Sequence, residues 1–381
     1  MIVMVAVVSV LATSVMSQRG YRSVVRQSIH YFARPHENLP SEHRFLPIQS
    51  PAAWIGGGLD EASWTYVLSK TDIETLEAAV IHFEHSGVTL DALDVRSDFP
   101  ISYAATKLFS EWRRQLSADG RGFQRIRGVP VDEWTERQSE IFFWAFGQLL
   151  GIAGAQDNTG ELLGHVRDVG ASAKTARQYL TNGRIDFHCD AADVVGLLCL
   201  KTAKTGGLSR IISSVSVYNR LLQRPDGQTH VRRLFSPVWL DSRGTGGVNF
   251  VSTHPLRRDD DGVLRTFWHT EYFRSYERHP KAPPMDDATT AALDAYDSVT
   301  ATDSDLWLDM ELRRGDIQLV SNHFLLHSRT AYEDHAEVEN KRHLLRLWIS
   351  LEEGKQSVWS WAKVIATGRV VYAFAWAKIF S

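Results

Sequence analysis

Residues 315–329 read Gly-Asp-Ile-Gln-Leu-Val-Ser-Asn-His-Phe-Leu-Leu-His-Ser-Arg. The apolar run within Asp316–Ser321 follows a glycine, and its length and β-branched content predict a short buried strand. Similar short segments with turn residues between them recur along the second half of the chain. They are Leu162–Arg167, Val194–Thr202, Ser209–Ser214, Val248–Thr253, Val263–His269, Leu306–Leu312 and His343–Leu351.

Helical periodicity lies mainly before these strands. Apolar residues recur at helical spacing in Thr71–His85, Tyr103–Leu116 and Glu136–Leu150, and 122–128 alternates as a strand does. Two further helices are expected at Val215–Leu222 and Asp286–Asp297. Helices followed by many short strands predict an α+β fold with a double-stranded β-helix (jelly-roll) core and flanking helices. A doubly wound parallel sheet is excluded because strands and helices do not alternate regularly.

Composition narrows the class of protein. The 381 residues contain 42 basic and 45 acidic side chains without long blocks of one sign, so we expect no nucleic-acid partner. The only two cysteines, Cys189 and Cys199, lie in segments expected to be buried. Such cysteine usage favours a reducing compartment and predicts a cytoplasmic protein.

The ends of the chain differ from its middle. Residues 1–50 are interpreted as an irregular N-terminal extension with an apolar run at 2–16, which is shorter than the about 20 residues of a spanning helix and has no preceding basic residue. Residues 51–355 are expected to form a single domain, and 356–381 an apolar C-terminal helix that docks on it. Membrane association through 2–16 remains the alternative, but it is not favoured.

A metal-binding pattern appears in two distant segments. His188 and Asp190 are two residues apart, so both side chains point to one face of an extended segment. His327 would bring a second imidazole from another strand. Two imidazoles and one carboxylate leave three positions open on an octahedral ferrous ion. The alternative for His188 and Asp190 alone is a polar pair in a loop.

An anion-binding pattern follows near the C-terminus. Arg342 and Arg346 are four residues apart in an apolar strand and therefore share a face. An arginine that faces inward is costly to desolvate unless an anion meets it. The guanidinium group matches a carboxylate in a bidentate manner, and the hydroxyl group of Ser209 could add a bond. If the arginines instead face solvent or pair with Asp or Glu, they have no such role.

Taken in order, these motifs resemble those of a known family. His188-Cys189-Asp190, residues 204–209 (Lys-Thr-Gly-Gly-Leu-Ser), Asn322 with His327, and the arginine pair look like the taurine dioxygenase-like (TauD/TfdA) family of Fe(II)- and 2-oxoglutarate-dependent oxygenases. The resemblance extends over about Gly122 to Leu351. It implies a dioxygenase that uses Fe(2+) and 2-oxoglutarate, with O2, to oxidise a small organic substrate, most simply by hydroxylation with release of succinate and CO2.

The resemblance also implies residue roles. His188, Asp190 and His327 would ligate iron, whereas His323 would be a loop or core histidine. Arg342 would clamp the distal carboxylate of 2-oxoglutarate with Ser209, and Arg346 is a further candidate for binding an anion. The roles of the two arginines could be exchanged. Two other hypotheses remain open: a metal-dependent hydrolase on the same triad, and a catalytically silent scaffold protein.

Overall fold

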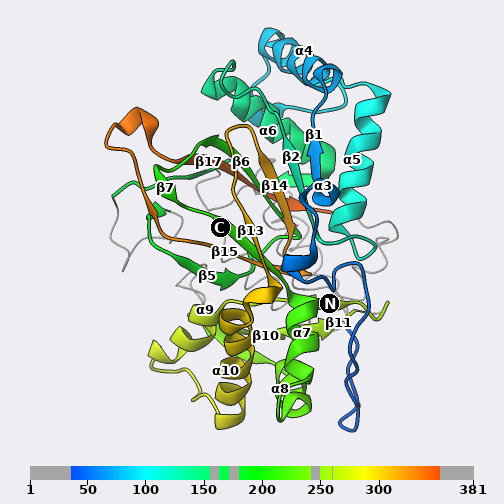
Figure 1. The fold of residues 1–381 in the computed structure, drawn as a ribbon, viewed down its shortest axis with the longest axis vertical. Coiled ribbons are helices and arrows are strands. Elements are labelled where there is room, and N and C mark those ends of the chain that lie inside the picture. Colours follow the sequence, from blue (N-terminus) through cyan, green and yellow to red (C-terminus); the bar gives the residue numbers. More distant parts are fainter. Residues whose placement is uncertain (1–35, 155–162, 171–179, 242–248, 260, 352–381) are drawn as a thin grey trace, which may run out of the picture.

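Two β-sheets form the centre of the protein (Figure 1). The computed structural model describes residues 36–154, 163–170, 180–241, 249–259 and 261–351. In the large sheet the strand order is β1-β2-β14-β6-β17-β3, with β4 also paired to β17. Its strands are β1 (Thr65–Val67), β2 (Phe123–Arg127), β14 (Ile317–Ser321), β6 (Val194–Lys201), β17 (His343–Ser350), β3 (Ile152–Gly154) and β4 (Gly164–Val166).

The smaller sheet has the order β13-β8-β15-β5. Its strands are β13 (Trp307–Met310), β8 (Ser209–Ser213), β15 (Leu325–Arg329) and β5 (Ile185–His188). All of its strand pairs are antiparallel, and in the large sheet only β1 and β2 run parallel. Side chains from both sheets share one hydrophobic cluster, as in a jelly-roll. The predicted fold class is confirmed.

Strand β17 shows how sequence alternation separates the two faces of the large sheet. Leu345, Leu347 and Ile349 pack into the cluster that contains the helices α4, α5 and α6. The alternate residues of β17 therefore point to the opposite face, toward the smaller sheet. Arg342, just before the strand, and Arg346, within it, belong to this alternate set of residues. Both are buried. The prediction that the two arginines face inward is confirmed.

Three amphipathic helices cover the outer face of the large sheet (Figure 1). They are α4 (Lys70–Ser86), α5 (Tyr103–Leu116) and α6 (Glu136–Leu150). Helices α4 and α6 both begin with a capping box, Ser69 with Asp72 and Thr135 with Gln138. These local signals explain why the predicted bounds of the three helices agree with the structure to within one residue.

The structure also contains a second group of helices and three short strand pairs that are separate from the two sheets. The helices are α7 (Ser214–Leu222), α8 (Gly227–Leu234), α9 (Thr270–Ser275) and α10 (Asp287–Thr302), and α3 (Glu61–Trp64) lies near β1. The strand pairs are β9 (Val238–Asp241) with β10 (Phe250–Thr253), β11 (Leu256–Arg258) with β12 (Leu264–Thr266), and β7 (Thr205–Gly206) with β16 (Tyr332–Glu333). Short 3-10 turns occur at η1 (Gly56–Gly58), η2 (Leu90–Ala92), η5 (Tyr276–Arg278), η6 (Ser304–Leu306) and η7 (Val338–Asn340).

Some expectations fall outside the described residues. The apolar run 2–16 and the C-terminal helix expected at 356–381 are among them, so the domain boundaries stay predictions. Within the part of the chain that the structure describes, no helix combines the length and apolar character needed to traverse a bilayer. Cys189 and Cys199 are both buried and unbonded to each other, as expected for core residues.

Candidate active site

Three side chains from two strands and a loop meet between the sheets. His188 ends β5 and is paired in register with His327 of β15, while Asp190 follows β5 by two residues. One ligand atom from each of the three residues lies within 4.8 Å of the others. The structure therefore brings together the three predicted metal ligands, although Asp190 and His327 are 137 positions apart in the sequence.

The two imidazoles have different polar neighbours. His188 Nδ1 lies 2.8 Å from the carbonyl oxygen of Asp186, and since a carbonyl only accepts, Nδ1 donates this hydrogen bond. His327 Nε2 lies 3.8 Å from Asp190 Oδ2. Burial, with a smaller contribution from His188, lowers the pKa of His327 to about 3. The His327 imidazole is therefore uncharged at neutral pH, which is the form that binds a metal ion.

The carboxylate of Asp190 is kept ionised by its neighbours. Burial by itself would raise its pKa, but Arg346, the two imidazoles and a hydrogen bond from Trp348 outweigh burial and lower the pKa to about 2. The Trp348 indole donates to Asp190 Oδ2 at 3.0 Å, and Arg346 Nη1 lies 3.9 Å from the same oxygen. The charge of Asp190 is therefore available to a cation at any physiological pH.

A hydrogen-bonded clamp fixes the loop that carries Asp190. The side chain of Asn322 accepts from the Asp190 amide at 3.0 Å and donates to the Ala192 carbonyl at 2.9 Å. His323 Nε2 lies 2.6 Å from Asp193 Oδ1, and both side chains are buried. His323 is therefore a core residue, as the sequence predicts, and it supports the loop from the far side.

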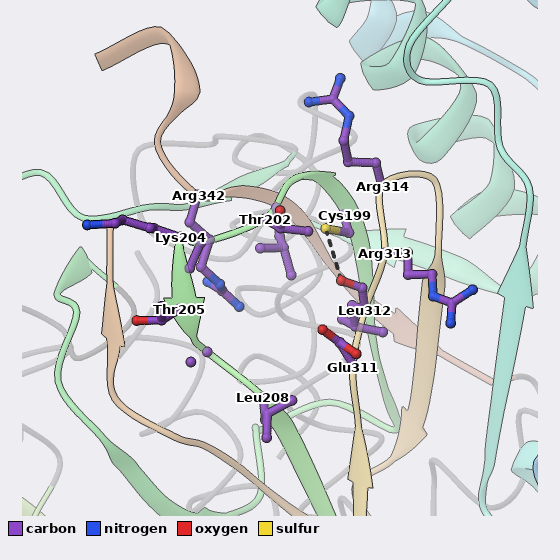
Figure 2. Close-up of a pocket in the computed structure, with 14 residues that line it drawn as sticks. Cys199, Thr202, Lys204, Thr205, Leu208, Glu311, Leu312, Arg313, Arg314 and Arg342 are labelled. Carbon is purple, nitrogen blue, oxygen red and sulfur yellow. Dashed lines mark hydrogen bonds between the residues drawn. The ribbon is translucent and has the colours of Figure 1, made fainter. Parts of the chain in front are cut away.

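A cavity of about 410 Å³ opens at the end of the sheets where β17 begins. Figure 2 shows Arg342 pointing into this cavity, whereas Lys204, Arg313 and Arg314 lie on its edge with their charged ends directed outward. Arg346 lies four residues farther along β17, on the same face, beside Asp190. The two arginines thus mark two points along one continuous face, one at the cavity and one at the triad.

The guanidinium group of Arg342 is held in position by the residues around it. It lies over the ring of Tyr332 at 5.1 Å, and a Cβ atom added to Gly207 would come within 3.1 Å of Arg342 Nε. Gly206 is closer still to β16, since an added Cβ would lie 2.3 Å from the Ala331 carbonyl. The two glycines of 204–209 therefore let the chain approach both β16 and Arg342.

Arg342 nevertheless retains unused hydrogen-bonding capacity. Its Nη1 is buried and has no hydrogen-bond partner among the described residues. Its backbone amide, not its side chain, bonds the carboxylate of Asp334, at 2.7 Å. Burial lowers the pKa of Arg342, which means that the charged form is not fully compensated by its surroundings. A buried donor of this kind is suited to an anionic ligand.

The neighbouring residues complete the polar interior. The Ser209 hydroxyl group donates to Gln318 Oε1 at 2.7 Å, and both side chains are buried. Arg329, in β15, also lies over the Tyr332 ring, with its guanidinium group 4.8 Å from the ring centroid. It donates a hydrogen bond to the Thr181 carbonyl at 2.7 Å. Ser209 thus faces the interior, as expected, with its hydroxyl group bound to an amide oxygen.

Sequence reasoning missed two aromatic features of the site. The sequence alone predicts no role for Trp348. Trp348 nevertheless follows Arg346 by two residues in a strand, so both side chains lie on the same face of the sheet. His269 forms a β-bridge with His188, its ring centroid lies 5.4 Å from that of His188, and it stacks on Tyr272 at 3.6 Å. No local sequence pattern indicates this second contact.

Comparison with known families agrees with this geometry. The family model described as "Taurine catabolism dioxygenase TauD, TfdA family" matches residues 87–348. The chain belongs to the TauD/TfdA family. The resemblance inferred from the motifs is confirmed, and the protein is an oxidoreductase of the dioxygenase class rather than a hydrolase. The predicted use of ferrous iron and 2-oxoglutarate is that of this family.

Two relatives were found by sequence. FR-33289 synthase from Streptomyces rubellomurinus is 32% identical over 319 residues, which cover 81% of this chain and 92% of the relative. The taurine hydroxylase-like protein SAT17 from Stachybotrys chartarum is 26% identical over 309 residues, which cover 77% of each chain.

Solved structures share the fold. Asparagine oxygenase in complex with Fe(II), 2S,3S-3-hydroxyasparagine and succinate superposes with a TM-score of 0.58 at 17% identity, covering 75% of this chain and 93% of its own. The non-heme iron oxygenase OrfP in complex with Fe and alpha-ketoglutaric acid gives a TM-score of 0.56 at 16% identity, covering 75% and 94%.

Proposed function

We propose that this dioxygenase binds Fe(2+) through His188, Asp190 and His327 and hydroxylates a small organic substrate, with release of succinate and CO2. The observation that carries the proposal is the convergence of these three side chains, within 4.8 Å of one another, on the face of the sheet that also presents two buried arginines. Two imidazoles and one ionised carboxylate fit a ferrous ion and leave positions open for co-substrate and O2.

When bound, the ferrous ion and 2-oxoglutarate supply the power to oxidise a C–H bond with O2. The residues of this chain position the reacting groups. The Asp186 carbonyl accepts from Nδ1 of His188 and so orients that ring, and the Trp348 indole donates to Oδ2 of Asp190 and so orients the carboxylate. Asn322 fixes the loop between these ligands.

We assign the distal carboxylate of 2-oxoglutarate to Arg342. Its buried guanidinium group, with Nη1 unpartnered in the described chain, fits a carboxylate fork better than any other group in the cavity. OrfP, which shares the fold, has been solved with alpha-ketoglutaric acid, which supports this co-substrate. Ser209 would share the carboxylate by turning its hydroxyl group away from Gln318.

Arg346 is assigned to an anionic group closer to the metal. It lies 3.9 Å from Asp190 Oδ2, so that an anion bound to it would lie next to the metal ligands. A carboxylate or another acid group of the substrate fits this position. Arg184, the other arginine near His188, is exposed and pairs with Asp186 at 2.9 Å, so it has no place in the site.

The proposed setting is that of a small-molecule enzyme in the cytoplasm. The two buried cysteines, which form no disulfide with each other, support a reducing compartment, and the balanced charge supports the absence of a nucleic-acid partner. The hydroxylated amino acids bound to asparagine oxygenase and OrfP support a small polar substrate and hydroxylation as the reaction.

Anaerobic titration with Fe(II) and 2-oxoglutarate tests the proposal. We expect a weak visible charge-transfer band from the chelate, which His188→Ala abolishes and Arg342→Ala shifts to higher co-substrate concentration. On admission of O2, the wild-type protein should form succinate. Absence of the band at saturating ligand would refute the ligand assignment. Succinate formation that persists in His188→Ala would do so as well.

A further inference from the structure

A second group of two imidazoles and one carboxylate lies on the opposite, helix-covered face of the large sheet. His165 belongs to β4, His343 begins β17, and Glu136 is the first residue of α6. One ligand atom from each residue lies within 4.8 Å of the others. Three separate elements thus meet at one point, which the proposed reaction does not use.

The two imidazoles are already in direct contact. His165 Nδ1 lies 2.8 Å from His343 Nε2, and the ring planes are tilted by only 31°. Two nitrogens bound to one tetrahedral zinc ion, each at about 2.0–2.1 Å, are about 3.4 Å apart. Separation of the rings by about 0.6 Å would therefore admit such an ion, a shift that an edge strand such as β4 can make.

Carboxylates are placed to complete the coordination. Glu136 Oε1 lies 4.0 Å from His343 Nδ1, whereas His343 Nε2 is the nitrogen that contacts His165, so Glu136, with 52% of its side chain exposed, rotates toward Nε2 to become the third ligand. Glu140, one turn farther along α6, lies 4.0 Å from His165 Nε2. With Nδ1 of His165 bound to a metal, its Nε2–H would face Glu140, an arrangement that orients metal-bound histidines.

Charged side chains near His343 bear on this role. Arg167, Lys201 and Glu136 all act on His343 through their charge. The positive charge of Arg167 and Lys201 opposes a cation, which the carboxylates of Glu136 and Glu140 offset.

We propose that Glu136, His165 and His343 form a second binding site, separate from the catalytic triad, for a divalent transition-metal ion of the zinc type. Two imidazoles and one carboxylate are the ligand set that suits zinc. Such an ion would tie the edge strand β4 and the central strand β17 to the start of α6. Its role is structural because the site lies on the face of the sheet opposite Arg342 and Arg346.

Zinc titration of the metal-free, full-length protein against a chromogenic chelator tests this site. We expect two zinc ions per chain in the wild type and one in His188→Ala, in which only the second site remains. Glu136→Gln, an exposed substitution that should not impair folding, should weaken one of the two wild-type sites at least 10-fold. His165→Asn should abolish that site. Glu74→Gln, which makes the same change on the exposed face of α4, serves as the matched control and should bind two ions.

A thermal-shift measurement separates the two sites further. Zinc should raise the Tm of His188→Ala, and Glu136→Gln introduced into that variant should remove the rise. Succinate formation in the presence of added Fe(II) should persist in Glu136→Gln. A stoichiometry of one in the wild type, or zinc binding by His188→Ala that is insensitive to Glu136→Gln, would overturn the proposal.

Discussion

The indole nitrogen of Trp348 donates a hydrogen bond of 3.0 Å to Oδ2 of Asp190. Trp348 is 8% exposed and lies on β17 two residues beyond Arg346, whose guanidinium group is 5.4 Å from the indole ring. The bond fixes the rotation of the carboxylate by holding Oδ2, the same oxygen that lies 3.8 Å from His327 Nε2 and 3.9 Å from Arg346 Nη1. A residue of the large sheet thus orients the proposed metal ligand in the loop after β5.

Trp348→Phe should therefore weaken iron binding without unfolding the protein. Loss of an outer hydrogen bond to a metal ligand typically lowers affinity about 10- to 100-fold. Anaerobic titration with Fe(II), read through the co-substrate charge-transfer band, measures this change. Trp239→Phe, at a partly exposed position on β9, is the matched control and should retain wild-type affinity. Equal affinities in the two variants would show that Trp348 has only a packing role.

Arg342→Lys tests whether the co-substrate is bound by the charge of Arg342 alone or also by the planar shape of its guanidinium group. Lysine keeps the positive charge but lacks the planar fork that binds a carboxylate through two hydrogen bonds. We expect the KM for 2-oxoglutarate to rise roughly 10- to 100-fold, with a smaller change in kcat, if about 1.4–3 kcal/mol of binding is lost. Steady-state succinate formation measures both constants. Arg313→Lys, at an exposed residue on the rim of the same cavity, should leave the KM unchanged.

Local signals allowed much of the fold to be predicted. The bounds of α5 and α6 could be found because apolar residues recur at helical spacing and Ser102 and Thr135 cap the first turns. The helix expected at Val215–Leu222 is found as α7 (Ser214–Leu222), and the Ser213 side chain caps its first turn by accepting from the Ser216 amide. In each case the deciding interactions lie within a few residues of chain.

Features that depend on distant contacts were missed. The sequence places His327 on a strand but does not give the bounds of β15, because His327, Ser328 and Arg329 are polar and no apolar alternation marks the strand. Trp348 and Asp190 are 158 residues apart, and their bond depends on the pairing of β17 with β6. The sequence identifies the candidate metal ligands. That they lie close together follows only from the register in which the strands pair.

Asn322→Ala should destabilise the loop that carries Asp190. The substitution removes an acceptor for the Asp190 amide and a donor to the Ala192 carbonyl, leaving two buried backbone groups unsatisfied. Each such group costs about 1–3 kcal/mol, so the free energy of unfolding should fall by roughly 2–4 kcal/mol. Urea denaturation measures the change. Asn340→Ala, at an exposed residue of η7, should have an effect below about 0.5 kcal/mol. A similar effect of both substitutions would contradict the clamp.

The His165–His343 contact predicts how stability depends on pH in the metal-free protein. Burial lowers the pKa of folded His343 to about 4, below the about 6.5 of an unfolded histidine. Above pH 6.5 both states carry a neutral imidazole and this contribution to stability is complete. Between pH 6.5 and 4 the unfolded state binds a proton that the folded state does not, so the free energy of unfolding falls as the pH falls.

The expected loss is roughly 2 kcal/mol over this range, after a reduction for solvent screening. Urea denaturation of chelator-treated protein at pH 7.5, 5.5 and 4.5 measures it. His343→Gln should flatten the profile, although the part due to His327, whose pKa is also lowered by burial, remains. His85→Gln removes an exposed imidazole near the end of α4 and should keep the wild-type profile. A wild-type slope retained in His343→Gln would mean that other groups, and not this contact, set the acid sensitivity of the protein.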